Sequence, residues 1–349
     1  MSKKKRKSKR KNQKIITICL LIVILCLGGI IYYYVFSDNE VDIPIIKEPK
    51  KEKKQLKIVD ENSNQRPIAV MYDNNVGYNS HAGLQDAYLS YEIIVEGGLT
   101  RIMALFKDKD VSLIGPVRSS RHYFLDYALE SDAIYCHFGW SEFAKNDITA
   151  LGVNNINGLT NESAYWRDKN IRAPHNVFTS TETLYKKAKE STYKTEVSDW
   201  KLLNYSVDEI NLSNDENTNS TIANNVNLKY SNYQTTSYSY DSENNYYLRS
   251  MDGNPHVDKN TKEQLHYKNI IVEKVFNRNL DSYGRQDLDT VGSNDGYYIT
   301  NGYAIPITWN KSSRSSKTKY TDINGKEIKV NDGNTFIQII PVTTQIEIS

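Results

Sequence analysis

The chain has 349 residues, of which 39% are hydrophobic and 25% are charged, with a formal net charge of +2. These values are ordinary for a globular protein and exclude a chain too polar to form a core. At about 150 residues per domain, the length predicts two domains. The net charge hides an asymmetry, because residues 3–14 hold nine Lys or Arg and no acid. Subtracting these nine charges from +2 leaves −7 on the rest of the chain.

Residues 15–36 form an uncharged apolar run of 22 residues after the basic segment. As a helix this run would be roughly 33 Å long, enough to cross a hydrocarbon core of about 30 Å. Because basic flanks stay in the cytoplasm, we predict a single-pass cell-membrane anchor with residues 1–14 inside and the bulk of the chain extracellular. Cleavage and lipidation signals are poor, since Leu25 before Cys26 is bulky, so the anchor is expected to stay uncleaved. Membrane lipid is the expected partner of the anchor and its basic tail, and nucleic acid is not an expected partner.

The rest of the chain divides by its composition. Residues 37–65 mix both charges with little aromatic content and are predicted to be a solvated tether. Strand-like and helix-like runs alternate over 66–195, which predicts a mixed α/β layered domain. A polar linker or loop is expected over 196–225, followed by a mostly β domain over 226–349 rich in Tyr and Thr. The predicted fold class is therefore α+β.

The predicted elements of the first domain start with a strand in RPIAVMYDN and two strands around Gly97-Gly98 in YEIIVEGGLTRIMALF. Helices are expected in HYFLDYALESDA, SEFAKNDITALG and TETLYKKAKES, with a strand in AIYCHFG. The second domain shows short strand-like runs, with hairpin signals at Asn324-Gly325 and Asp332-Gly333. Cys136 lies in a predicted buried strand and is the only cysteine beyond the anchor, which excludes an intramolecular disulfide there.

Carboxylates among strand-like residues are the first site candidates, because an ionised side chain is rarely buried without a partner. On the predicted strand, Glu92 and Glu96 share one face, and a tight turn would set Glu96 opposite Arg101. Two carboxylates about 5–10 Å apart can hydrolyse a glycoside. Glu92, Glu96 and Asp73 are therefore the catalytic candidates. The alternative is an ordinary cross-strand ion pair.

The segment GPVRSSR predicts an anion site. Its Gly-Pro fixes a turn, and Arg118 and Arg121 then precede a predicted helix with free N–H groups. Two guanidiniums beside such groups suit a phosphate or a carboxylate. Alternatively, both arginines pair with Glu92 and Glu96, and the two interpretations are compatible.

The segment WRDKNIRAPHN predicts a polar loop, since Pro174 excludes a helix there. It adds Arg167, Arg172, His175 and Asn176 to the predicted ligand-binding residues. No histidine pair has the spacing of a metal site, so neither a metal nor a cofactor is expected. The sequence also lacks the P-loop, GxSxG and GxGxxG motifs.

The chain resembles the YerB-like lipoproteins of Gram-positive bacteria. The matching segments are RPIAVMYDN, SYEIIVEGGLTRIMALF, IGPVRSSRHYF, YWRDKNIRAPHNVFTS and ITWNKSSRSSKTKYTDINGKEIKVNDGNTFIQIIP. The resemblance implies an extracytoplasmic module of two domains and offers no catalytic residues to carry over. The segment TRIMALFKDKDVSLIGPVRSSR is also similar in layout to the LytR-CpsA-Psr phosphotransferases, in which arginines hold a lipid pyrophosphate.

Together these observations predict a membrane-anchored extracytoplasmic protein of the cell envelope. It would bind an anionic wall-related or lipid-linked ligand through Arg101, Arg118, Arg121 and Arg172. The expected partners are a cell-wall polymer, a lipid-linked precursor or an envelope protein. The alternative is an envelope enzyme, either a LytR-CpsA-Psr-like phosphotransferase or a glycan hydrolase.

Overall fold

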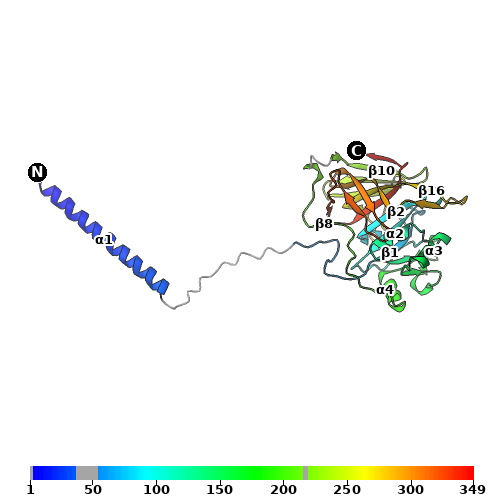
Figure 1. Cartoon of the computed structure of the whole chain (residues 1–349), viewed down its shortest axis with the longest axis horizontal. Coiled ribbons are helices and arrows are strands. Elements are labelled where there is room, and N and C mark those ends of the chain that lie inside the picture. The colour runs from blue at the N-terminus through cyan, green and yellow to red at the C-terminus, as the bar shows by residue number, and fades with distance from the viewer. Residues whose placement is uncertain (1–2, 37–53, 215–218) are drawn as a thin grey trace. The chain divides into compact units, whose positions relative to one another are not determined.

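The computed structural model describes residues 3–36, 54–214 and 219–349, which belong to two units, Met1–Lys53 and Lys54–Ser349. The first unit holds helix α1 (Lys3–Phe36), in which Lys14–Phe36 is 23 residues long and apolar enough to cross a membrane. The second unit holds the other described helices and strands (Figure 1).

The folded unit begins earlier than the sequence predicts. Of the predicted tether, residues 37–53 lie outside the described residues, whereas 54–65 belong to the second unit. Leu56 and Val59 are buried there. The side chain of Asp332 accepts hydrogen bonds from the amides of Lys57 and Ile58 at 2.8 and 3.0 Å. Leu56, Ile58 and Val59 stand among the lysines and give this segment enough apolar surface to pack on the folded unit.

An eleven-stranded sheet forms the centre of the second unit. The N-terminal half contributes β1 (Ile68–Asp73), β2 (Leu89–Ile94), β3 (Thr100–Phe106), β4 (Ile134–His137) and β5 (Asn155–Asn157). The C-terminal half contributes β9 (Thr221–Ile222), β15 (Asn269–Val275), β18 (Gly292–Thr300), β19 (Tyr303–Lys311), β20 (Lys319–Thr321) and β22 (Thr335–Pro341). The order is β20-β19-β18-β15-β22-β2-β3-β1-β4-β5, and β9 pairs with β19.

Strand β22 joins the two halves of the chain. It lies between β15 and β2 and runs parallel to both, with Gln338 opposite Val272 on one side and Glu92 on the other. Every residue of β22 is buried, as expected for the largely apolar run TFIQIIP in a strand covered on both faces. The predicted domains 66–195 and 226–349 therefore share one sheet.

A six-stranded sheet packs on one face of the central sheet. Its strands are β10 (Asn225–Lys229), β11 (Thr235–Asp241), β12 (Tyr246–Met251), β13 (Asn254–Pro255), β14 (His266–Tyr267) and β23 (Gln345–Ile348). Tyr238 and Tyr267 contact Phe336 of β22 edge-on, at ring-centroid distances of 6.3 and 4.9 Å. Three strand pairs lie apart from both sheets: β6 (Trp166–Arg167) with β7 (Val177–Phe178), β8 (Tyr205–Ser206) with β21 (Val330–Asn331), and β16 (Asn277–Asn279) with β17 (Gln286–Leu288).

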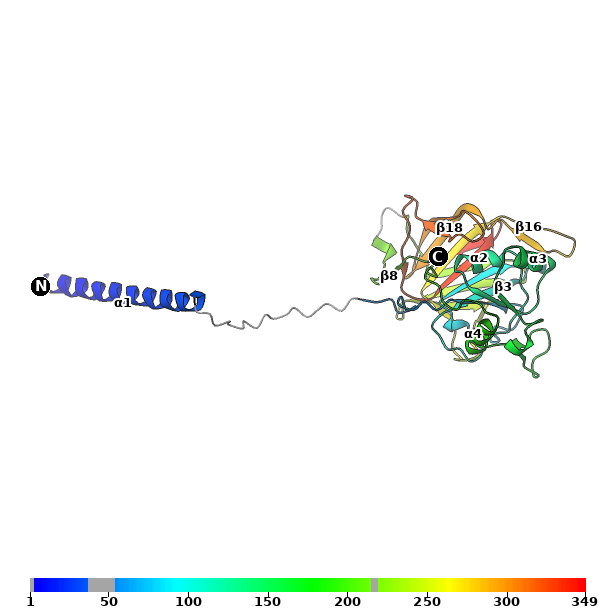
Figure 2. The same ribbon diagram turned by 60° about the horizontal axis from the view of Figure 1, so that its bottom comes forward.

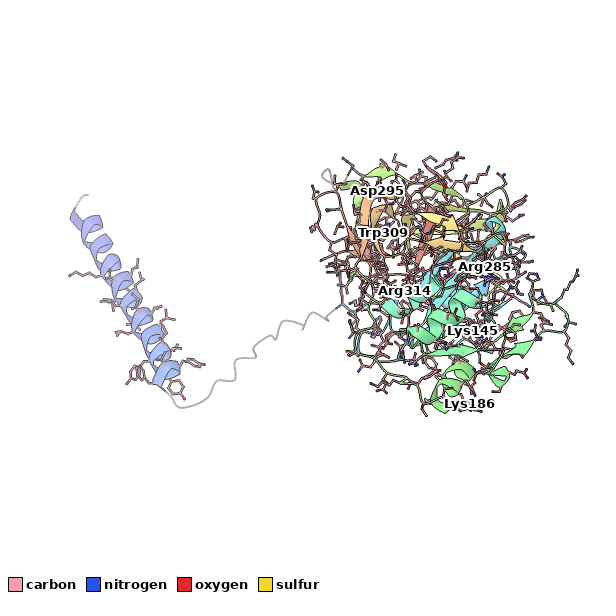
Figure 3. The ribbon with its side chains drawn as sticks, turned by 45° about the vertical axis from the view of Figure 1, so that its right-hand side comes forward. Lys145, Lys186, Arg285, Asp295, Trp309 and Arg314 are labelled. Atoms are coloured by element: carbon pink, nitrogen blue, oxygen red, sulfur yellow. The ribbon has the colours of Figure 1, made fainter. Side chains whose placement is uncertain are left out.

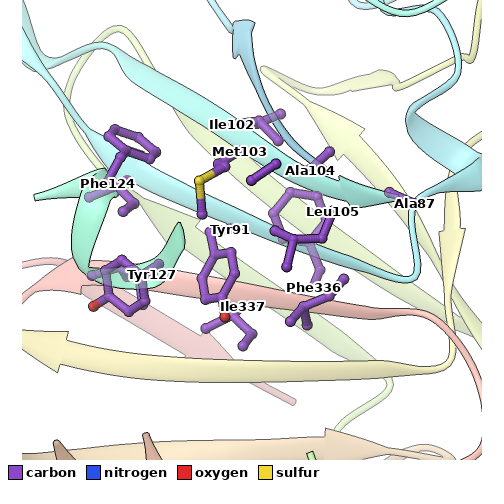
Figure 4. Packing of buried hydrophobic residues seen from close by; sticks show 14 of the residues in the cluster. Ala87, Tyr91, Ile102, Met103, Ala104, Leu105, Phe124, Tyr127, Phe336 and Ile337 are labelled. Carbon is purple, nitrogen blue, oxygen red and sulfur yellow. The ribbon is translucent and has the colours of Figure 1, made fainter. Parts of the chain in front are cut away.

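Helices α2 (Phe124–Glu130), α3 (Glu142–Ala150) and α4 (Thr181–Glu190) confirm the three predicted helices of this region. Helix α2 packs on the sheet face opposite the second sheet, where Figure 4 shows Tyr91 and Met103 facing Phe124 and Tyr127. Both ribbon views place α2 and α3 near the β16–β17 hairpin, which extends from the body (Figures 1 and 2). Short 3-10 turns are η1 (Leu84–Asp86), η2 (Glu96–Gly98), η3 (Glu162–Ala164) and η4 (Leu212–Asn214).

Two local predictions are wrong. Strand β2 ends at Ile94 and Glu96 lies in η2, so Arg101 stands opposite Ile93 in the ladder and not opposite Glu96. The signal at Asp332-Gly333 does not make a hairpin, because β21 pairs with β8. The described residues of 196–225 also pack on the folded unit, through buried side chains that include Trp200, Leu203 and Leu212.

Candidate functional site

A cavity of about 320 Å³ opens where loops from both halves of the chain meet, and we call it the His175 pocket. Its lining residues come from four segments: Asn75, Val76, Gly77, Asn79 and Ser80; Pro116; Ile171, Arg172 and His175; and Lys259. The first segment follows the end of β1, and the third is the loop between β6 and β7. The polar loop predicted from WRDKNIRAPHN therefore forms one wall of the pocket.

Asp73, the last residue of β1, fixes the position of His175. Its side chain is buried, and its Oδ2 accepts a hydrogen bond from Nδ1 of His175 at 2.7 Å. The same oxygen lies 2.9 Å from Nε of Arg118, and Oδ1 accepts the amide of Asn75 at 3.1 Å. Within the described residues, Nε2 of His175 has no hydrogen-bond partner. The carboxylate therefore orients the imidazole and leaves its second nitrogen available.

Two cationic side chains also line the pocket. Arg172 is exposed, and it has no ion pair among the residues that the structure describes. Nζ of Lys259 lies 3.8 Å from Asp168, a weak pair in which both side chains are 30% exposed. Lys259 belongs to the C-terminal half, and nothing in its local sequence HVDKN marks it as a site residue. Sequence reasoning therefore missed it.

A chain of buried polar groups runs inward from Asp73. The Asp73 carbonyl accepts from Nε2 of His81 at 2.7 Å, and Nδ1 of His81 contacts Nε2 of His256 at 2.7 Å. His256 then contacts Arg249, whose guanidinium donates to Glu92 at 2.8 Å. Burial lowers the pKa of His81 to about 4 and that of His256 well below its ordinary value, so both imidazoles are neutral at pH 7.

Glu92 ends this chain at the contact between the two sheets. Its carboxylate accepts from Asn74 at 3.0 Å, Thr100 at 2.7 Å, Thr236 at 2.9 Å and Arg249 at 2.8 Å. The side chains of Glu92 and Arg249 are both 0% exposed. Because Glu92 is fully buried and its oxygens accept from four donors, its carboxylate links the two sheets and does not face an open cavity.

The remaining charges of the predicted site form a separate cluster. Arg121 binds Glu96 through two hydrogen bonds of 2.6 and 2.9 Å. Burial alone would raise the pKa of Glu96, and the hydrogen bonds from Arg121 lower it below its ordinary value. Arg101 donates to the carbonyl of Ser119. Burial and the nearby Arg121 and Arg118 lower the pKa of Arg101 to about 10, so it stays charged.

Arg167 and Asn176 close the base of the loop that carries His175. Nη1 of Arg167 donates to Oδ1 of Asn176 at 2.7 Å, and Nδ2 of Asn176 donates to the Asp168 carbonyl at 3.1 Å. The structure thus brings Asp73, Arg118, Arg172 and His175 together, with Arg167 and Asn176 as supports. Glu92, Glu96, Arg101 and Arg121 lie outside the pocket lining. Within the described residues, no group of three or more His, Cys, Asp or Glu side chains is suited to a metal ion.

The sequence matches the models of two domains described as "Protein of unknown function (DUF3048)", the N-terminal one over residues 55–194 and the C-terminal one over 224–337. The chain belongs to the DUF3048 family. It is 29% identical over 297 residues to "Putative lipoprotein YerB" of Bacillus subtilis (strain 168), covering 84% of each chain. A crystal structure of the Bacillus subtilis YerB protein matches with a TM-score of 0.72 and 28% identity, covering 84% of this chain and 97% of that chain. The YerB-like resemblance and the α+β fold class are confirmed.

The DUF3048 boundaries clarify the position of the His175 pocket. Asp73, Arg172 and His175 belong to the N-terminal DUF3048 domain, and Lys259 belongs to the C-terminal one. The Glu92–Arg249 pair joins the same two domains. The pocket therefore opens where the two domains meet, and ligand sites are common at such boundaries.

Proposed function

We propose that this DUF3048 protein is a single-pass membrane protein whose folded unit lies outside the cell and binds an anionic ligand in the His175 pocket. The apolar stretch Lys14–Phe36 and the lipoprotein name of YerB support membrane association. The nine basic residues of 3–14 favour a cytoplasmic N-terminus. Helix α1 then acts as an uncleaved anchor, with Leu25 before Cys26 opposing lipidation.

One observation carries the ligand assignment: buried Asp73 holds His175 beside Arg172 and Lys259 on a single cavity. Arg172 and Lys259 are cationic donors, and donors that converge in this way bind a phosphate or a carboxylate, with each charge-assisted hydrogen bond contributing about 1.5–3 kcal/mol. Val76, Pro116 and Ile171 add an apolar wall. A phosphate or carboxylate on a wall polymer, or on a lipid-linked precursor, fits this combination.

The arginines around the pocket have different roles in this proposal. Arg172 contacts the ligand, and Arg118 acts through Asp73, which it neutralises. Glu96 neutralises Arg121, and Arg101 donates to the Ser119 carbonyl, so neither arginine contacts the ligand in this proposal. Glycan hydrolysis by Glu92 and Glu96 gains no support from the geometry, because Glu92 is fully buried and Glu96 is paired.

Calorimetric titration of the full-length chain in detergent with sodium pyrophosphate tests the proposal. We expect Arg172→Ala and Lys259→Ala each to weaken binding about tenfold, which corresponds to about 1.4 kcal/mol. The matched control is Lys145→Ala, which removes an exposed lysine of α3 (Figure 3) and is expected to bind as the wild type does. Equal pyrophosphate affinity in all four proteins would contradict the assignment.

A further inference from the structure

A second cavity, of about 440 Å³, lies beside the β6–β7 hairpin, and we call it the Trp166 pocket. Phe138, Tyr165 and Trp166 line it with aromatic rings, and Glu162 and Arg167 line it with charged groups. Trp166 is 40% exposed although it is one of the largest apolar side chains of the unit. An exposed aromatic ring in a cavity is stabilised when a ligand covers it.

Two of the three rings of the Trp166 pocket, those of Tyr165 and Phe138, are held by contacts. The hydroxyl of Tyr165 donates to the Ile156 carbonyl at 2.6 Å, and its ring meets that of Phe138 edge-on at 5.8 Å. Gly158 provides the floor, because a Cβ at this position would lie 2.1 Å from the Phe138 ring. The pairing of β6 with β7 places the backbone of Trp166 opposite Phe178. A pocket with rigid walls needs little ordering when it binds a ligand.

Flat rings beside a carboxylate and a guanidinium suit one class of ligand, a sugar. One face of a pyranose presents C–H groups that stack on an aromatic ring, and its rim presents hydroxyls that both donate and accept hydrogen bonds. Glu162 accepts such bonds and Arg167 donates them. The guanidinium of Arg167 lies 4.8 Å over the Phe138 ring and uses one nitrogen for Asn176, which leaves other N–H groups for a ligand.

The Trp166 pocket and the His175 pocket share their supports. Arg167 of the first donates to Asn176, and Asn176 follows His175 directly in the chain. The Phe138 amide donates to the carbonyl of Arg118 at 3.0 Å, so a wall of the first pocket is also joined to the Asp73 cluster. We propose that the Trp166 pocket binds a sugar ring of the same ligand whose acid group occupies the His175 pocket, which makes the ligand an anionic glycan. This inference rests on the proposed function and specifies its ligand class.

Three probes separate the two pockets when each is titrated into the full-length chain in detergent. They are sodium pyrophosphate, the neutral sugar triacetylchitotriose, and the acidic disaccharide N-acetylglucosaminyl-N-acetylmuramic acid. We expect Trp166→Ala to weaken both sugars at least tenfold and to leave pyrophosphate unchanged, whereas Trp166→Phe retains most of the sugar affinity. Arg172→Ala should weaken pyrophosphate and the disaccharide and leave chitotriose unchanged. Tyr283→Ala, which removes a 73% exposed ring elsewhere, is the control and should change none of the three.

The possible failures are distinguishable. Pyrophosphate binding that depends on Arg172, without sugar binding that depends on Trp166, overturns this inference and leaves the proposed function standing. Sugar binding that depends on Trp166, without any effect of Arg172→Ala on the disaccharide, overturns the shared ligand, and the anion site is overturned with it only when Arg172→Ala leaves pyrophosphate binding unchanged too. A tri-leucine peptide that binds through Trp166 as tightly as chitotriose assigns the pocket to peptide and overturns the inference. Absence of binding by all three probes overturns both proposals.

Discussion

Glu92 and Arg249 form an ion pair of 2.8 Å in which both side chains are 0% exposed. Removing one partner of such a pair leaves an uncompensated buried charge, which costs about 3–5 kcal/mol. We therefore expect Arg249→Met to lower the free energy of unfolding by about that amount, measured by urea denaturation of the full-length chain. The control Arg278→Met removes a 58% exposed arginine that pairs with Asp287 and Asp289, and should cost less than about 1 kcal/mol. Similar losses in both variants would contradict this account of Glu92.

Glu273 predicts a pH dependence of stability. Burial raises the pKa of its carboxyl to about 7, against hydrogen bonds from Tyr320 and Tyr127, and nearby Glu130 raises it further. The unfolded chain has a value of about 4.3, so the stability that Glu273 contributes is fully present below about pH 4.3 and is lost as the pH rises through 7. The expected loss is on the order of 3 kcal/mol.

Comparison of wild type with Glu273→Gln isolates this group. His81 has a lowered pKa and contributes the opposite slope below neutral pH, but it is present in both proteins. Urea denaturation at pH values from 4 to 8 should show the wild type losing stability relative to the variant as the pH rises. Parallel stability curves for the two proteins would show that Glu273 titrates normally.

At this scale the sequence reveals part of the candidate site. Arg118, Arg172 and His175 could be predicted because each lies in a polar loop, and Asp73 because it ends a strand where such a loop begins, and both are local signals. The partner of Glu92 could not be predicted, since Arg249 comes 157 residues later and only the packing of the two sheets brings them together. Lys259 could not be predicted for the same reason, because only folding brings this residue of the C-terminal half to the pocket.

At the scale of single elements, helix α4 offers a direct test of local signals. Ser180 precedes it, and its Oγ accepts the amide of Thr183 at 3.2 Å. We expect Ser180→Ala to cost about 1 kcal/mol in the free energy of unfolding and Ser180→Asp to preserve stability. Ser191→Ala, at the other end of the same helix, is the control and should be near neutral, because Ser191 caps with its backbone amide. Equal losses at both ends would argue against an N-cap at Ser180.

Helices and turns differ in how far the sequence determines them. Helices α3 and α4 could be predicted because a capping serine and an apolar periodicity coincide. The turn after β2 could not, because Gly97 and Gly98 both have positive φ values, 71° and 73°, and allow several turn geometries. The turn is wider than the tight turn that the sequence predicts, and it places Glu96 outside the strand, where it pairs with Arg121.

On the scale of the whole molecule, the shared sheet is the feature that sequence patterns do not show. An apolar run such as TFIQIIP predicts a buried strand but not its neighbours, and parallel pairing leaves no local turn signal. Strand β22 pairs with β15 of its own half and with β2 of the other half. The two DUF3048 domains are therefore separate in sequence and continuous in hydrogen bonding.

This continuity predicts that residues 54–349 unfold as one cooperative unit. Without β22, a fragment of residues 54–195 leaves one edge of β2 unpaired, from Leu89 to Ile93, although every residue of β2 is buried in the intact unit. An exposed apolar edge of this kind aggregates. We expect the fragment alone to be insoluble or to lack dispersed amide signals in NMR spectra, and co-expression with residues 196–349 to restore a soluble complex. The control is the 54–349 fragment, which should show a single calorimetric transition. Two separate transitions, or a fragment 54–195 that folds by itself, would mean that the interdomain ladder adds little stability and that each domain has a sufficient core of its own.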